Sequence, residues 1–383
     1  MIKNISASYA GHIVDSELGL SGKPVNDRKY SNSELSKSFS WALELSKLMD
    51  SAGYDEFWMA EHHFQPEGFE CIPNLVMLNL YLSTQTSNLK FGCGFNIAPM
   101  WHPLRLAEDF ATADILSNGR LIFGVGRGYH SREVETFGAP LQNSDDNREL
   151  FEEQVEIIIK AFNNEEFSHK GKHYTLPAPV EYRGYTLEKL SLVPRPLSTP
   201  VDIWQPLVSG NPKGIDFMAK NNIKALVATT PKSSLNERLT MYQEAYAKHG
   251  KTIDLGENIA LGFRFFIADS QEKAIEQARP YFEEAMKFAA PLGLLQLSEE
   301  QISAVASPNS SATVQLPTLE AAVENETWLC GPADQIAEKI LEISEKYPGV
   351  SRLNLGSTMG TPLKVYKEQL QLFADKVMPK VKK

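Results

Sequence analysis

Short apolar runs alternate with amphipathic stretches along this chain. Each stretch that follows a run repeats its apolar residues at helical spacing, and Gly, Pro or Asn residues often separate the two. The pattern predicts eight strands, each followed by a helix. The predicted strands are Ile2–Ser8, Tyr54–Ala60, Leu89–Ile97, a strand that starts at Arg120, Val201–Trp204, Ile223–Ala228, Ile259–Ile267 and Arg352–Gly356.

Capping and breaking residues place the helix ends. Ser31 and Glu34 have the spacing of a capping box, and Gly53 ends the helix that follows. Gly331-Pro332 starts another helix, because proline is favoured at the first helical position. Further predicted helices include Asn74–Thr86, Pro103–Leu116, Pro212–Lys220, Ser233–His249 and Ser270–Met286.

The alternation of strands and helices predicts an α/β fold with a parallel sheet. Eight repeats over 383 residues favour a closed (β/α)8 TIM barrel, with the whole chain, 1–383, as a single domain. A doubly wound open sheet is the alternative. Two irregular stretches predict long insertions, Asn163–Pro200 after strand four and Ala289–Val323 after strand seven.

Composition narrows the class of partner. The net charge is −10 and the pI is near 5.4, which argues against a nucleic-acid binder and against an anionic membrane partner. Cys71, Cys93 and Cys330 match neither a disulfide framework nor a zinc site, so a reducing compartment is expected. The first residues lack a signal-peptide core and no apolar run is long enough to span a membrane, so the expected location is the cytoplasm.

Candidate chemistry lies where the predicted strands end. In a (β/α)8 barrel the reactive residues lie at the carboxyl ends of the strands. That rule selects His62, Asn96, Arg127, Tyr129 and the turn Ser209-Gly210-Asn211. The glycines of Gly124-x-Gly126-x-Gly128 let backbone approach a ligand, and Arg127 suits a phosphate or carboxylate; a tight turn with a solvated arginine fits about as well. The spacing is not GxGxxG and a polar loop follows, which argues against a dinucleotide site.

The histidines have structural interpretations beside functional ones. His62 and His63 are adjacent, so an extended chain points them to opposite sides, and no metal site is expected. A histidine at a strand end can transfer protons near neutral pH, or it can be hydrogen-bonded under a loop. His102 precedes a proline, and a place at a helix start is favoured for it.

Two arginines and one turn have alternatives of the same kind. Arg264 lies among apolar residues, where an ion pair is favoured over a role in lining a site. Arg148 is expected in the first turn of a helix, where the helix dipole disfavours a cation, so a bound anion or a surface ion pair would explain it. The turn at Ser209-Gly210-Asn211 either holds a phosphate or only caps the next helix.

These residues together resemble one family. The segments that carry the resemblance are Ala60-Glu61-His62-His63-Phe64, Asn96-x-x-Pro99-x-x-His102-Pro103-x-Arg105, Glu108-Asp109, Ser117-Asn118-Gly119-Arg120, Gly124-Val125-Gly126-Arg127-Gly128-Tyr129 and Leu372-Phe373-Ala374-x-x-Val377-Met378-Pro379. Each motif is modest, but their order and spacing hold over nearly the whole chain. The chain is similar to the bacterial luciferase-like, flavin-dependent monooxygenases.

The resemblance implies a (β/α)8 barrel that binds FMN, usually as reduced FMN delivered by a separate flavin reductase, and that uses oxygen to oxidise a small organic substrate. By position, Arg127 and Arg148 match arginines that hold the FMN phosphate. Gly94-Phe95 matches a position where the family often has a cis peptide under the flavin ring, and His62 matches the family's active-site histidine. The residues expected to bind the cofactor are Gly94, Phe95, Asn96, Arg127, Tyr129, Arg148, Ser209 and Gly210.

Several outcomes stay open within this resemblance. The same barrel hosts deazaflavin-dependent reductases, and a non-catalytic flavin-binding protein is a further alternative; a nicotinamide dehydrogenase is opposed by the glycine spacing. Gly126 stands where luciferases carry a cysteine, which argues against light emission. The family is often dimeric, so a homodimer is expected. The two insertions are rich in apolar and aromatic residues, which suggests only a partly apolar organic substrate.

Overall fold

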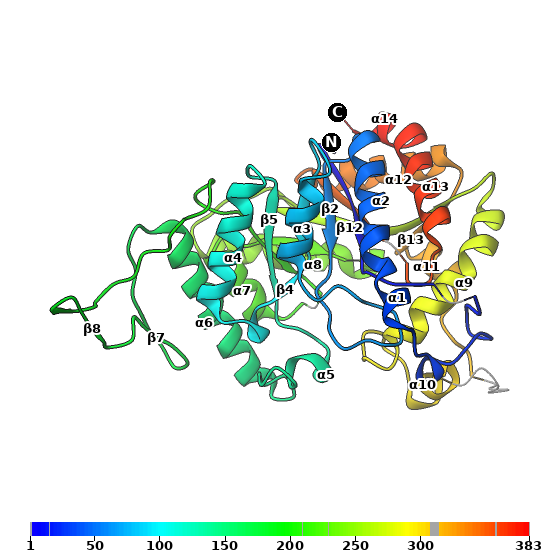
Figure 1. Cartoon of the computed structure of the whole chain (residues 1–383). Helices are drawn as coiled ribbons and strands as arrows, with labels where there is room; N and C mark the ends of the chain where they lie inside the picture. The colour runs from blue at the N-terminus through cyan, green and yellow to red at the C-terminus, as the bar shows by residue number, and fades with distance from the viewer. Residues whose placement is uncertain are drawn as a thin grey trace.

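A computed structural model describes residues 2–14, 16–208, 210–228, 230–306, 314–356 and 358–382. Its main sheet is a closed, all-parallel barrel with helices between the strands, as the sequence predicts (Figure 1). Neighbouring strands follow the order β10-β11-β12-β14-β1-β2-β3-β5, and a pairing of β10 with β5 closes the ring. The open-sheet alternative is therefore wrong.

The barrel strands lie close to the predicted runs. Ile259–Ile267 and Arg352–Gly356 have the predicted bounds, whereas the predicted strand Leu89–Ile97 is divided into β3 and β4 by a cis peptide bond between Gly94 and Phe95. The strands of the sheet are β1 (Asn4–Tyr9), β2 (Glu56–Met59), β3 (Lys90–Cys93), β4 (Asn96–Ile97), β5 (Leu121–Gly126), β10 (Ile203–Pro206), β11 (Lys224–Val227), β12 (Ile259–Ile267), β13 (Trp328–Gly331) and β14 (Arg352–Gly356).

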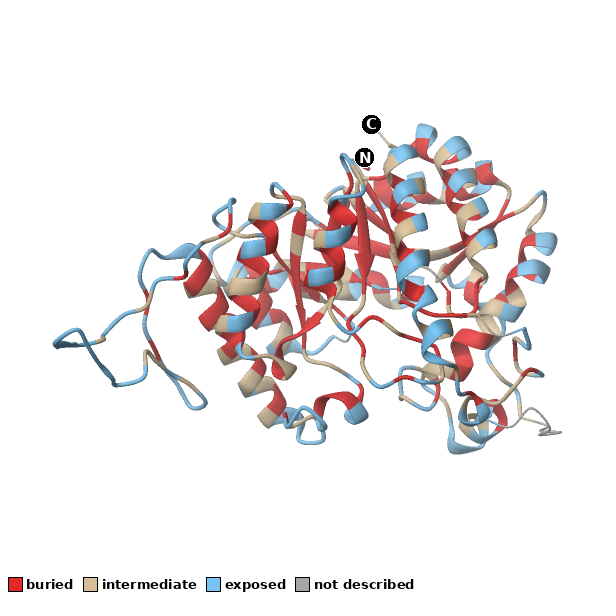
Figure 2. Ribbon diagram, viewed as in Figure 1, coloured by how far each residue is buried: buried red, intermediate tan, exposed pale blue. Residues whose placement is uncertain are grey.

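Side chains along each barrel strand alternate between the lumen and the surrounding helices. Trp58, Trp204 and Ala260 form a buried cluster inside the barrel. Their neighbours in sequence, such as Phe57 and Leu261, belong to the larger core between the strands and the helices. Figure 2 shows both layers as a continuous buried band through the centre of the molecule. The strands are therefore buried on both faces, mostly by apolar residues, which explains the apolar runs in the sequence; β1 and β14 are exceptions with polar residues such as Ser6 and Asn354.

Helices begin and end mostly at the predicted caps. The side chains of Ser31 and Glu34 form the predicted capping box, and Pro103–Leu116 and Pro212–Lys220 have the predicted bounds. No helix in the described ranges is long and apolar enough to cross a membrane. The helices are α1 (Asn32–Leu35), α2 (Lys37–Ser51), α3 (Leu75–Ser83), α4 (Pro103–Leu116), α5 (Ser131–Val134), α6 (Ser144–Asn163), α7 (Pro212–Lys220), α8 (Lys232–Lys248), α9 (Gln271–Ala289), α10 (Glu299–Ala306), α11 (Leu319–Glu324), α12 (Ala333–Lys346), α13 (Leu363–Lys376) and α14 (Met378–Val381).

Both insertions are more regular than the sequence suggests. The first forms an arm that projects away from the barrel beyond α6 (Figure 1), built on two hairpins, β6 (His169–Lys170) with β7 (Thr175–Leu176) and β8 (Glu181–Tyr182) with β9 (Tyr185–Thr186). Strands this short have no detectable period. The second insertion contributes α10 and α11, and the unpredicted β13 follows it and pairs with the far end of β12.

Candidate active site at the mouth of the barrel

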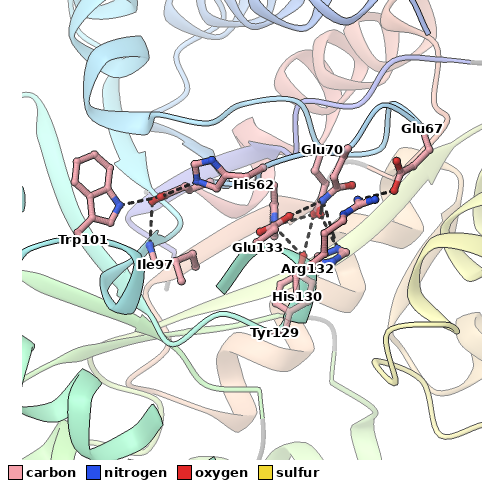
Figure 3. Close-up of polar contacts among 12 residues, drawn as sticks. His62, Glu67, Glu70, Ile97, Trp101, Tyr129, His130, Arg132 and Glu133 are labelled. Atoms are coloured by element: carbon pink, nitrogen blue, oxygen red, sulfur yellow. Dashed lines mark hydrogen bonds and ion pairs between the residues drawn. The ribbon is translucent and has the colours of Figure 1, made fainter. Parts of the chain in front are cut away.

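The carboxyl ends of the parallel strands open at one end of the barrel. The loop that follows β2 carries His62, and the chain that leaves β5 carries Arg127 and Tyr129. The loop between Gly126 and α6 is not wholly irregular, because it contains the short helix α5 with a buried Glu133. The loop after β2 and the segment at α5 meet at the carboxyl end of the barrel. Figure 3 shows their polar side chains turned toward one another.

His62 is held between two buried glutamates. Its Nδ1 lies 3.1 Å from Glu133 Oε2, and its Nε2 lies 3.1 Å from Glu70 Oε1 (Figure 3). The Tyr129 hydroxyl is 2.9 Å from His62 Nε2 and donates to Glu70 Oε1 at 3.0 Å. His62, Glu70 and Glu133 are each less than 5% exposed. The side chain of His62 is therefore fixed at both ring nitrogens.

The charges in this cluster favour a protonated ring. Burial alone lowers the pKa of His62, but the carboxylates of Glu70 and Glu133 outweigh it and raise the pKa to about 10. Burial alone raises the pKa of Glu133. Its hydrogen bonds to His62 and Gln65 outweigh burial and hold the pKa of the carboxyl below its usual value. At neutral pH His62 is an imidazolium that can donate a proton.

Gln65 and His130 complete the cluster on its inner side. Gln65 Nε2 donates to Glu70 Oε2 and to Glu133 Oε1, both at 3.0 Å, so it bridges the two carboxylates. Burial lowers the pKa of His130, which leaves this second ring neutral beside the charged one. His62, Glu70 and His130 offer ligand atoms within 4.8 Å of one another, so they are the residues here that could hold a metal ion.

His63 turns the other way, as expected for adjacent residues of an extended chain. Its Nε2 lies 3.1 Å from Glu61 Oε1, and the same oxygen accepts from Trp101 Nε1 at 2.8 Å. The second oxygen of Glu61 accepts from the backbone N–H of Ile97 at 3.0 Å. Glu61 therefore attaches the loop after β2 to β4 and to the segment that follows it.

Arg127 and Arg148 form a second polar group beside the mouth. Arg127 Nε donates to Asn147 Oδ1 at 2.8 Å and its Nη2 donates to the backbone oxygen of Ser144 at 2.7 Å, so both partners are neutral. Burial lowers the pKa of Arg127, and the nearby Arg148 lowers it further. Glu152 lies 3.7 Å from Arg148, which is the ion pair foreseen as an alternative. α6 starts at Ser144, so Arg148 lies beyond the first turn, and the expected clash with the helix dipole is wrong.

Comparison with known proteins identifies the family. The model for luciferase-like monooxygenases matches residues 19–350. The chain belongs to the luciferase-like monooxygenase family. The oxygenase component of a flavin-dependent trigonelline monooxygenase from Acinetobacter baylyi is 27% identical over 61% of this chain, and the match spans only 60% of that relative. Members of this family are oxidoreductases, so the chain is an enzyme.

Solved luciferase-like structures share the fold over the full length. The oxygenating constituent of 3,6-diketocamphane monooxygenase from Pseudomonas putida, in complex with FMN, has a TM-score of 0.74 at 21% identity and covers 100% of this chain and 99% of its own. An F420-dependent secondary alcohol dehydrogenase has a TM-score of 0.66 at 16% identity, with 100% of both chains covered. At these identities the likeness shows the fold and leaves the choice of cofactor open.

The arginine pair fits the phosphate of a flavin mononucleotide. Two guanidinium groups repel each other, and Arg148 and Glu152 form the one ion pair made by these two arginines among the described residues. A carbon placed on Gly214 would be 3.2 Å from Arg148 Nη1, so this group reaches the first turn of α7. Helix N-termini attract anions, because their backbone N–H groups are unpaired. These donors are those that a luciferase-like enzyme would need at this position.

The expected ring-binding segment follows β3. The cis peptide bond between Gly94 and Phe95 stands where the family resemblance places it. Asn96 is fully buried and its side chain donates to the backbone oxygen of Gly124 at 3.0 Å, so it adds a side-chain contact between the paired strands β4 and β5. A side chain at Gly124 would meet the Cys93 oxygen at 2.0 Å, which explains a glycine at this contact.

The remaining sequence candidates are separated by the fold. Tyr129 binds His62 and Glu70 and contributes to the histidine cluster, while Gly210 is exposed in the turn before α7. Ser209 lies outside the described residues. His102 caps α4 by accepting from the N–H of Leu104, as favoured from the sequence.

Sequence reasoning missed the residues that position His62. Glu70 and Gln65 are polar residues in the loop after β2 and Glu133 lies in the short helix α5, and nothing local marks them as buried. His130 follows Tyr129 directly at the end of β5, so the strand-end rule was the one signal that could have found it.

Proposed function

We propose that this chain is the oxygenase component of a two-component monooxygenase, which takes reduced FMN from a separate flavin reductase and uses oxygen to oxidise a small organic substrate. The observation that carries the proposal is the pairing, at one barrel mouth, of a buried histidine held between two glutamates with two neighbouring arginines. The first supplies a proton and the second binds a phosphate.

The arginine pair would hold the cofactor by its phosphate. Arg127 is oriented by Asn147 and by Ser144, and among the described residues it makes no direct ion pair, although the charges of Glu152 and Asp145 act on it. A dianionic phosphate would remove the repulsion between the two guanidinium groups and gain charge-assisted hydrogen bonds. Reduced FMN would supply the electrons and the site of reaction with oxygen when bound; the chain supplies position and a water-poor wall.

His62 would act as the proton donor of the reaction. Both ring nitrogens carry hydrogens in the protonated state, and Glu133 fixes the ring through Nδ1. The Tyr129 hydroxyl lies beside Nε2, and Tyr129 as a residue is 38% exposed, so this side chain would be the group through which a proton leaves the cluster toward a bound molecule. Glu70 and Glu133 keep the ring charged between turnovers. A proton donor in reach of the reacting atoms typically contributes a rate factor of about 10² to 10⁴.

The test uses reduced FMN in the absence of air, followed by rapid mixing with oxygenated buffer. We expect a saturable change of flavin fluorescence on binding, and slower reoxidation of the bound flavin than of free reduced FMN, measured by absorbance. His62→Gln should bind reduced FMN as the parent does but change the reoxidation trace. Reoxidation at the rate of free flavin, at saturating protein, would reject the proposal.

A deazaflavin-dependent oxidoreductase is the second candidate. It is favoured by one observation, the fold shared with an F420-dependent alcohol dehydrogenase. Titration of the protein with FMN and with F420 under identical conditions separates the two. Tighter binding of F420 than of FMN would support this second candidate and overturn the first, whereas the absence of any flavin reaction with oxygen, despite FMN binding, would indicate a storage protein.

A further inference from the structure

Arg264 points into the barrel close to its mouth. Along β12, Ala260 belongs to the cluster inside the lumen, while Phe263 and Phe265 pack outward in the main core. Because side chains alternate along a strand, Arg264 lies on the inner face with Ala260. It is partly buried, four residues further toward the carboxyl end than Ala260.

The guanidinium of Arg264 has no partner among the described residues. Other enclosed arginines of the chain do have one, since Arg28 is paired with Glu284 and Arg352 with Glu56. Burial lowers the pKa of Arg264, and no carboxylate offsets this effect. The ion pair favoured from the sequence is therefore not found. A cation removed from water without a counter-ion is costly, which points to an anion that binds there.

The residues beside Arg264 on the next two strands, β14 and β1, are small. Arg264 is paired with Gly356 on β14, and Gly356 with Ser8 on β1. A side-chain carbon at Gly356 would be 3.5 Å from Arg264 Cγ, so the stem of the arginine lies across this glycine. The same hydrogen-bonded row continues from Ser8 to Trp58 on β2, the strand that leads to His62. The side chains of Arg264 and Trp58 thus face the same lumen. They are three strand spacings apart, or about 14 Å along the curved sheet.

We propose that Arg264 binds a carboxylate of the organic substrate and so makes this enzyme selective for anionic substrates. The inference rests on the proposed function, because it needs the barrel mouth to be the oxidation site. The planar fork of a guanidinium matches a carboxylate at two hydrogen bonds. Arg264 is separate from the arginines assigned to phosphate, because β10 and β11 lie between β12 and β5.

The experiment measures binding of matched anionic and neutral probes by titration calorimetry. The probes are benzoate with benzamide and hexanoate with hexanamide, added to protein with and without oxidised FMN. We expect at least one carboxylate to bind the parent about tenfold or more tightly than its amide. Arg264→Met should abolish that preference, and Arg264→Lys should retain part of it. The control is Arg279→Met, which removes a surface arginine paired with Glu320 and should leave the preference unchanged.

Two results would overturn the inference. One is a parent protein that does not prefer either carboxylate over its amide, or an Arg264→Met variant that keeps the preference. The other is a loss of FMN affinity in Arg264→Met, because the arginine would then serve the cofactor. Failure of the proposed function has a different signature: the parent would not bind FMN, while the carboxylate preference could still be measured without it.

Discussion

The histidine cluster and the arginine pair differ in how their charges are balanced. Around His62 each ring nitrogen faces a carboxylate, and the carboxylates are bridged by Gln65. Around Arg127 the partners are neutral, and the nearest charge that lowers its pKa is another guanidinium. In the first group carboxylates contact both ring nitrogens, whereas in the second Arg127 makes no ion pair among the described residues and Arg148 has only the 3.7 Å pair with Glu152. This difference supports the proposal that the cluster is set before any ligand arrives and that the arginine pair receives an anion.

The largest expected effect on stability comes from removing one of the carboxylates that contact His62. Glu133→Gln keeps the shape of the side chain but removes one of the two charges that balance His62. Removing one partner of a buried pair typically costs about 3–5 kcal/mol, and we expect the low end because Glu70 remains. The free energy of unfolding from urea titration measures this loss. An unchanged midpoint and slope would mean that His62 is not charged in the folded protein.

Removing Arg127 from the arginine pair should weaken ligand binding more than it changes the stability of the protein. Arg127→Met should weaken FMN binding about tenfold to a hundredfold, because charge-assisted hydrogen bonds contribute about 1.5–3 kcal/mol. Without ligand its stability should fall by less than about 3 kcal/mol, because relief of the repulsion from Arg148 offsets part of the loss of the hydrogen bonds to Asn147 and Ser144. Flavin fluorescence and thermal unfolding provide the two measurements, with Arg279→Met as the control. Parent-like FMN affinity would remove Arg127 from the phosphate site.

The pH dependence of stability sharpens the comparison. The folded pKa of His62 is raised to about 10, above about 6.5 for the unfolded chain. Its contribution is therefore fully present below about pH 6.5 and is lost as the pH rises toward 10, with a slope of at most about 1.4 kcal/mol per pH unit. We expect stability of the parent to fall between pH 7 and 9 more steeply than that of His62→Gln. Parallel curves would contradict the raised pKa.

The barrel follows largely from local signals in the sequence. β12 and β14 have their predicted bounds: β12 is a mostly apolar run, and β14 alternates Leu353 and Leu355 with Arg352, Asn354 and Gly356. β13 is not predicted because it is short and pairs only with the extension of β12 beyond the barrel. That pairing joins Arg264 to Trp328, and contacts so distant in sequence leave no periodicity in either segment.

The candidate site follows from the sequence only in part. Strand ends and family motifs select His62 and Arg127, because both positions are fixed by the barrel. They do not select Glu133, which lies in the short helix α5, two positions before the exposed Glu135. The difference between the two is contact with His62, which is 71 residues away. Long-range electrostatic partners of this kind are invisible to local patterns, and the unpaired state of Arg264 is invisible for the same reason.

The smallest expected loss of stability, at an exposed ion pair, tests whether burial makes the charges around His62 important for stability. Arg132 is the residue before Glu133 in α5 and forms an ion pair with Glu67 at 2.6 Å, but its side chain is 41% exposed. Exposed pairs contribute about 0–1 kcal/mol, because water screens the charges and two flexible side chains must be fixed. Arg132→Gln should therefore cost less than about 1 kcal/mol in the same urea titration, against about 3 kcal/mol for Glu133→Gln. Equal losses from these adjacent positions would show that disruption of α5 is responsible, and the balanced charges around His62 would no longer explain the stability of the cluster.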